Sequence, residues 1–134
     1  MNVFINLCIQ DVARSRAFFT ALGFAFNEQF CTEDTLGMQI GETAFAMLLL
    51  PSKFQTFTPR SIVDPTKSTE VLIALQQDSK AAVDAMIATA VAAGGAEFRP
   101  AEDHGFMYGR SFCDPDGHVW ETFWFDASTL EGQA

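Results

Sequence analysis

The order of strand, helix and further strands occurs twice along the chain, and this repeat constrains the fold more than any other feature of the sequence. In the first copy, side chains alternate over residues 2–9, which indicates a strand with two different faces. Asp11 is a suitable N-cap for the helix that follows, and Gly23 is a suitable C-terminal stop. The pattern then predicts three shorter strands, over residues 24–30, 36–40 and 44–50.

The second copy follows a connector, residues 51–69, which holds three of the five prolines and predicts one helical turn around residues 53–57. Residues 71–75 alternate as a strand, and Ser79 lies at the start of a helix that ends at Gly94. Further strands are predicted over residues 96–100, 106–113 and 118–124, the last two joined by the turn 114–117. We expect one domain over residues 1–134, with modules 1–50 and 70–126 and a loose tail 127–134.

Charge and composition restrict the partners of such a domain. Eight Lys and Arg against 17 Asp and Glu give a net charge of -9, which disfavours nucleic acids and anionic membranes and favours neutral or cationic ligands. The longest apolar run, residues 44–50, is too short to span a membrane, and the three cysteines form no CxxC motif, so we expect a cytoplasmic protein. The 14 phenylalanines predict apolar surface in a cavity or in a homodimer interface.

Two segments carry a resemblance to a known superfamily. Residues 6–24 (NLCIQDVARSRAFFTALGF) and 114–121 (DPDGHVWE) resemble the opening and closing segments of the vicinal oxygen chelate superfamily, which includes glyoxalase I, bleomycin-resistance proteins and extradiol dioxygenases. The chain looks most like the bacterial lactoylglutathione-lyase-related members. The resemblance implies paired βαβββ modules that form a curled, cup-shaped, eight-stranded sheet with helices outside. The sequence pattern predicts the same α+β arrangement.

The resemblance also implies four metal-ligand positions, one on each of four strands. Here they hold Phe4, Met47, Leu72 (or Glu70 if the register slips by two) and Glu121. Phenyl and isobutyl groups have no lone pair to donate and a thioether is a poor ligand for such ions, so Glu121 alone keeps a ligand type. We therefore expect no bound metal and no other cofactor. A rearranged site built from Glu70, His104 and Glu121 is the alternative.

The alternation of the strands also suggests which side chains line the cup. Glu121 shares a strand face with Phe123, and in an apolar pocket its pKa would rise, as suits a catalytic acid or base; the alternatives are an ion pair with a nearby Arg or Tyr, or exposure to solvent. Tyr108 and Arg110 share a face and could orient a ligand, or Arg110 could pair with Glu121. Asn6 could bind a ligand or satisfy a buried group. The predicted lining residues are Phe4, Asn6, Met47, Leu72, Tyr108, Arg110 and Glu121, with Phe123 at the edge.

Two classes of function fit these features. The first is a protein that binds a small hydrophobic or cationic molecule in the cup without a metal, which the missing ligands, the acidity and the phenylalanines favour. The second is a lyase or isomerase of the glyoxalase type, using a divalent metal or metal-free acid/base chemistry through Glu121. We predict the binding protein, and leave open whether it catalyses a reaction.

Overall fold

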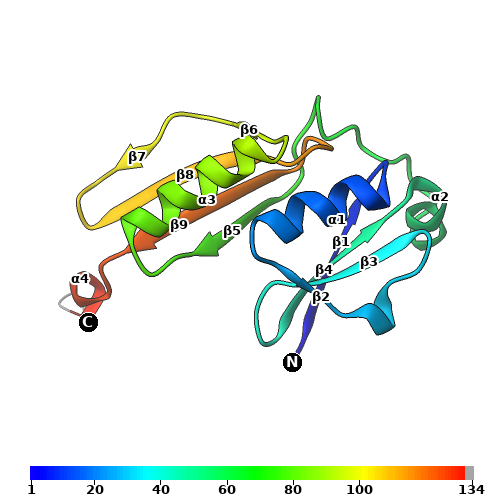
Figure 1. Cartoon of the computed structure of the whole chain (residues 1–134), viewed down its shortest axis with the longest axis horizontal. Coiled ribbons are helices and arrows are strands. Elements are labelled where there is room, and N and C mark those ends of the chain that lie inside the picture. The colour runs from blue at the N-terminus through cyan, green and yellow to red at the C-terminus, as the bar shows by residue number, and fades with distance from the viewer. Residues whose placement is uncertain (132–134) are drawn as a thin grey trace. The chain divides into compact units, whose positions relative to one another are not determined.

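The chain folds into two compact units, Met1–Asp64 and a second that begins at Pro65 (Figure 1). The computed structural model describes residues 1–131. Each unit has its own mixed β-sheet with one long helix on one face. No helix in the described part of the chain has both the length and the apolar character needed to cross a membrane.

The first unit has a four-stranded sheet in the order β1-β4-β3-β2, in which β1 is parallel to β4 and the other pairs are antiparallel. Its elements are β1 (Val3–Cys8), α1 (Val12–Ala21), β2 (Ala25–Phe26), the 3-10 turn η1 (Glu28–Phe30), β3 (Thr35–Gln39), β4 (Ala44–Leu49), α2 (Pro51–Phe54) and the 3-10 turn η2 (Gln55–Phe57).

Helix α1 has the local signals that its sequence predicts. The Asp11 carboxylate accepts a hydrogen bond of 3.0 Å from the backbone N–H of Arg14, and the chain leaves the helix through Gly23 at a φ of 96°. Phe18 and Phe19 are buried beneath the helix, as is a row of leucines in the sheet: Leu7, Leu36 and Leu48. Burial of each phenyl ring stabilises the unit by about 2–3 kcal/mol.

The second unit has a sheet in the order β5-β9-β8-β6, with β7 also paired to β8, and β5 parallel to β9. Its elements are β5 (Leu72–Gln76), α3 (Lys80–Ala92), β6 (Ala96–Glu97), β7 (Glu102–Asp103), β8 (Met107–Cys113), β9 (Val119–Phe125) and α4 (Ala127–Glu131). The buried Trp120 lies between Ile73 and Phe112 in the strand register, and α3 buries Val83 and Ile87.

The turn between β8 and β9 is built on a buried carboxylate. Oδ1 of Asp114 accepts hydrogen bonds from the backbone N–H groups of Asp116 and His118, each at 3.0 Å. Its Oδ2 accepts a third from the indole Nε1 of Trp120 at 3.0 Å. Turn chemistry explains the first two bonds, whereas the third ties the turn to the core of the unit.

The predicted α+β class is confirmed, as is the order of strand, helix and strands in each unit. The described residues form nine strands in two sheets rather than eight, because the two-residue strand β7 is too short to show alternation. The strand predicted over residues 24–30 ends at Phe26, where η1 replaces it. Part of the predicted tail forms the short helix α4, and its last residues, 132–134, lie outside the described chain.

Candidate functional site

The face of the first sheet that is turned away from the buried leucines carries exposed aromatic side chains. The register places Phe4 beside Phe45, and Asn6 beside Met47. The Phe4 and Phe45 rings stack with centroids 4.8 Å apart and an interplanar angle of 13°. Phe4 is 47% exposed, which is unusual for a phenylalanine inside a strand. The structure thus brings together the three site residues predicted in this unit, and Asn6 is exposed.

Phe30 extends this aromatic face over strand β3. Its ring meets that of Phe4 edge to face, with centroids 6.4 Å apart, and it remains 42% exposed. It can lie there because β3 has Gly37 beneath it. A Cβ at that position would stand 2.6 Å from the Cβ of Phe30, closer than van der Waals contact permits.

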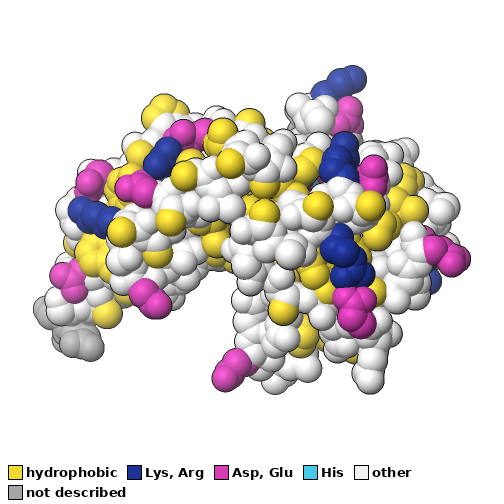
Figure 2. Space-filling model, viewed as in Figure 1, with side chains coloured by type: hydrophobic (Ala, Val, Ile, Leu, Met, Phe, Trp, Pro, Cys, Tyr) yellow, Lys and Arg dark blue, Asp and Glu magenta, His cyan; other side chains and the backbone are white. Residues whose placement is uncertain are grey.

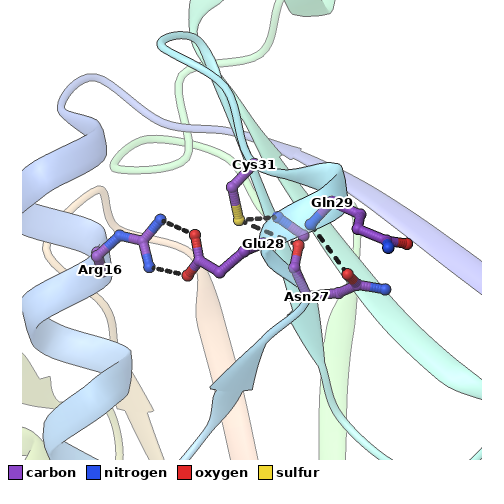
Figure 3. A network of polar contacts seen from close by, with 6 residues as sticks. Arg16, Asn27, Glu28, Gln29 and Cys31 are labelled. Carbon is purple, nitrogen blue, oxygen red and sulfur yellow. Dashed lines mark hydrogen bonds and ion pairs between the residues drawn. The ribbon is translucent and has the colours of Figure 1, made fainter.

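A polar network holds η1, the turn that carries Phe30 (Figure 3). Arg16 of α1 donates two hydrogen bonds to Glu28, of 2.6 and 3.2 Å, and the hydrogen bond lowers the pKa of that carboxyl. Asn27 caps the turn by accepting from the backbone N–H of Gln29 at 3.0 Å. The Cys31 thiol donates to the Asn27 carbonyl at 3.3 Å. These residues could not be predicted from the sequence, because a pair twelve residues apart leaves no periodic signal.

The second sheet also has a second face, opposite the face packed against α3 (Figure 1). The register places Glu121 beside Ala74, and Phe123 beside Gln76, so Leu72 belongs to the same face. Leu72 is 54% exposed, and Phe123 stacks on Phe125 with centroids 6.2 Å apart. Three further predicted site residues, Leu72, Glu121 and Phe123, therefore share one face of this unit.

Glu121 is paired with an arginine rather than enclosed by apolar groups. Arg99 Nη2, from the connection between β6 and β7, donates to Glu121 Oε2 at 2.8 Å, and Arg99 Nη1 donates to Glu102. Partial burial acts to lower the pKa of Arg99, but its hydrogen bonds to the two carboxylates outweigh that effect, so the pKa lies above its ordinary value. Of the alternatives that the sequence left open, the structure shows the ion pair with a nearby arginine.

Tyr108 and Arg110 do not share a face with Glu121, which corrects the prediction from sequence. Arg110 lies beside Thr122 in the register, on the side of the sheet covered by α3. The Tyr108 hydroxyl donates to Asp84 of α3 at 2.6 Å, and Arg110 donates to Asp84 at 2.8 Å and to Glu97 at 2.9 Å. These two residues therefore fasten the helix to the sheet. Arg110 pairs with Asp84 and Glu97, and not with Glu121.

Side chains of both signs are mixed over the surface. On the face drawn in Figure 2, acidic groups are scattered over both units and lie beside basic groups in several places. Arginine side chains lie within 4.0 Å of carboxylates in both units, as in Arg16–Glu28 and Arg110–Asp84. The net charge of -9 is thus not gathered into one patch on that face.

Known proteins resemble this chain in sequence and in structure. Residues 2–41 match the family model described as bleomycin resistance protein-like N-terminal. The hypothetical protein SA1046 from S. aureus is 30% identical, with 92% of this chain and 93% of that chain covered and a TM-score of 0.79. At that identity over nearly the full length of both, the two chains belong to one family. A search of curated proteins found no match.

Two further solved structures share the fold of this chain. A glyoxalase-related enzyme from Fulvimarina pelagi is 23% identical, covering 92% of this chain and 87% of that chain with a TM-score of 0.79. A glyoxalase/bleomycin resistance protein/dioxygenase family enzyme from Burkholderia phytofirmans PsJN is 19% identical, covering 91% and 96% with a TM-score of 0.75. The chain has the glyoxalase/bleomycin resistance/dioxygenase fold. The lactoylglutathione-lyase-related subtype stays a prediction.

This glyoxalase-type fold implies a divalent metal, and the residues at the matched positions do not fit one. Three of these positions, Phe4, Met47 and Leu72, have side chains without an oxygen or nitrogen atom. At the fourth, the carboxylate of Glu121 accepts a hydrogen bond from Arg99. Within residues 1–131, no group of three or more His, Cys, Asp or Glu side chains lies close enough to hold a metal ion. The rearranged set with Glu70 and His104 is therefore not assembled in the described chain.

Proposed function

We propose that this chain binds a small hydrophobic or cationic molecule, without the metal of the glyoxalase fold. The observation that carries this proposal is the aromatic face of the first sheet, formed by Phe4, Phe30 and Phe45 beside Met47. Two of these rings are more than two-fifths exposed although they lie over a sheet. Exposed apolar patches of this kind on a soluble domain are typical of binding surfaces.

The energetics favour a flat, apolar ligand. A molecule that removes about 100 Å² of apolar surface from water gains roughly 2.5 kcal/mol, and stacking on a phenyl ring adds about 0.5–1.5 kcal/mol. A positive charge on the ligand would gain about 0.5–2 kcal/mol over a ring face, and the net charge of -9 would attract it from a distance.

The alternative is a lyase or isomerase of the glyoxalase type. With a metal, it would need ligands that the matched positions lack; without one, it would need Glu121 free to exchange a proton. In the structure the carboxylate is held by Arg99 at 2.8 Å, so a substrate would have to displace that guanidinium first. We expect no stoichiometric metal and no activity on the methylglyoxal–glutathione adduct. Elemental analysis that finds about one metal per chain, lost in Glu121→Gln, would favour the enzyme.

The binding proposal can be tested with a thermal-shift screen of small aromatic molecules, followed by NMR of ¹³C-methyl methionine. A bound ligand should shift the Met47 methyl resonance and leave that of Met86, on α3, unchanged. Phe4→Ala should weaken binding about tenfold, through loss of stacking and of buried area. Phe57→Ala is the matched control, because Phe57 lies in the same unit and is 64% exposed but lies in η2, outside the aromatic face. Equal losses in both variants would refute the proposed site.

A further inference from the structure

One guanidinium bridges two carboxylates in the second unit. Arg99 donates through Nη2 to Glu121 and through Nη1 to Glu102. The three side chains are 40%, 24% and 48% exposed, so water and small molecules can reach them. In residues 1–131, Arg99 is the one side chain that forms an ion pair with Glu121. Arg99 could leave Glu121 without losing its charge compensation, because Glu102 would still hold it.

The surroundings of Glu121 combine this carboxylate with apolar surface. Leu72 and Phe123 belong to the same face of the sheet, and Leu72 is 54% exposed. Gly109, beside Phe123 on β8, leaves that phenyl ring without a neighbouring side chain across the strand pair. An apolar surface next to a single carboxylate suits a ligand with a flat body and a positively charged end.

A buried hydroxyl provides a second, independent indication of a ligand. Ser111 lies directly beside Glu121 in the register of β8 and β9, and therefore on the same face. It is 0% exposed, and its Oγ has no hydrogen-bond partner in the described chain. Buried hydroxyls are nearly always paired. Three buried polar atoms without a partner are found in the described chain, Arg110 Nε, Ser111 Oγ and Thr122 Oγ1, and Ser111 Oγ is the one that lies on the face of Glu121, where a donor from a ligand could pair with it.

We propose that this face binds an aromatic cation, a flat ring that carries an amidinium or guanidinium group, and that Arg99 occupies the position of that group until the ligand displaces it onto Glu102. The cationic end then takes over the hydrogen bond to Glu121, and an N–H of the ligand reaches Ser111. An anion is disfavoured because two carboxylates already neutralise Arg99. A neutral ligand is also disfavoured, because it cannot replace the positive charge of Arg99 next to the Glu121 carboxylate. This site goes beyond the proposed function and depends on the second unit alone.

The test compares benzamidine with benzamide, two probes of the same shape that differ in charge, by calorimetry and by amide NMR of Ser111 and Glu121. Arg99→Gln should bind benzamidine about three- to fivefold more tightly, since it removes the internal competitor. Glu102→Gln should bind it about two- to threefold more weakly, because Arg99 then has Glu121 as its one partner. Glu121→Gln should abolish the preference for benzamidine.

Arg60→Gln is the control for net charge, because Arg60 lies in the first unit and forms no ion pair in the described chain; it should change neither affinity. Circular dichroism of each variant establishes that it is folded, and Glu102→Gln provides a test even if Arg99→Gln does not fold. Benzamidine affinity that is unchanged or weaker in Arg99→Gln, or that rises in Glu102→Gln, would overturn the proposal. Shifts at the Met47 methyl report on the first unit, so failure there and failure here are separate results.

Discussion

Replacing Asp114 by asparagine tests how the turn between β8 and β9 is joined to the core. Asparagine keeps the shape of the side chain but replaces one carboxylate oxygen by an NH₂ group. That group must face either the Trp120 indole N–H or the two backbone N–H groups of the turn, so donors meet donors in both orientations. Loss of the charge-assisted bond and one unsatisfied buried donor together cost about 2–4 kcal/mol.

The assay is urea unfolding followed by circular dichroism and tryptophan fluorescence, in which such a loss lowers the midpoint by roughly 1–2 M. The indole N–H resonance of Trp120 should move in the NMR spectrum while that of Trp124 stays in place. Asp78→Asn is the matched control, because Asp78 is exposed in the same unit. A loss of stability below about 0.5 kcal/mol, or an unmoved Trp120 resonance, would refute the reasoning.

Three further predictions concern packing, charge and assembly. Gly37→Ala should cost about 1–3 kcal/mol and displace the Phe30 ring in ¹H NMR, whereas Gly41→Ala, with nothing within 4 Å, should do neither. The Tyr108 hydroxyl and a neighbouring guanidinium lower the pKa of Asp84, so its contribution to stability is present above about pH 4 and is lost as the pH falls through the folded-state pKa; an unchanged unfolding profile between pH 5 and 2 in Asp84→Asn would contradict this. We expect a two-fold symmetric homodimer, and a monomer mass of 14.7 kDa in light scattering would disprove it.

The order of the elements could be predicted because its signals are local. The N-cap at Asp11, the positive φ at Gly23 and the alternation in β1 each depend on a few adjacent residues. The face on which Glu121 lies could also be predicted, because Trp120 is large and apolar and its burial decides the orientation of the whole strand β9.

The partners of the site residues could not be predicted in this way. Arg99 lies between two short strands, and only the path of that connection brings it to Glu121, 22 residues along the chain. The sequence around Tyr108 and Arg110 has no clear alternation, so their face depends on the register with β9, which no local pattern specifies. The order of the elements therefore follows from local sequence patterns, whereas the contacts of the site residues follow from pairing between distant parts of the chain.

The placement of β9 has a consequence for synthesis on the ribosome. This strand lies in the middle of the second sheet, between β5 and β8, yet it is near the end of the unit in sequence. Translation of the 70 residues from 65 to 134 takes roughly 4–14 s at about 5–20 residues per second. During much of that time β5 has been synthesised without β9, the strand that joins it to β8, while all strands of the first unit have already been synthesised. A nascent chain arrested before Val119 should therefore expose the apolar side chains of β5 to chaperones.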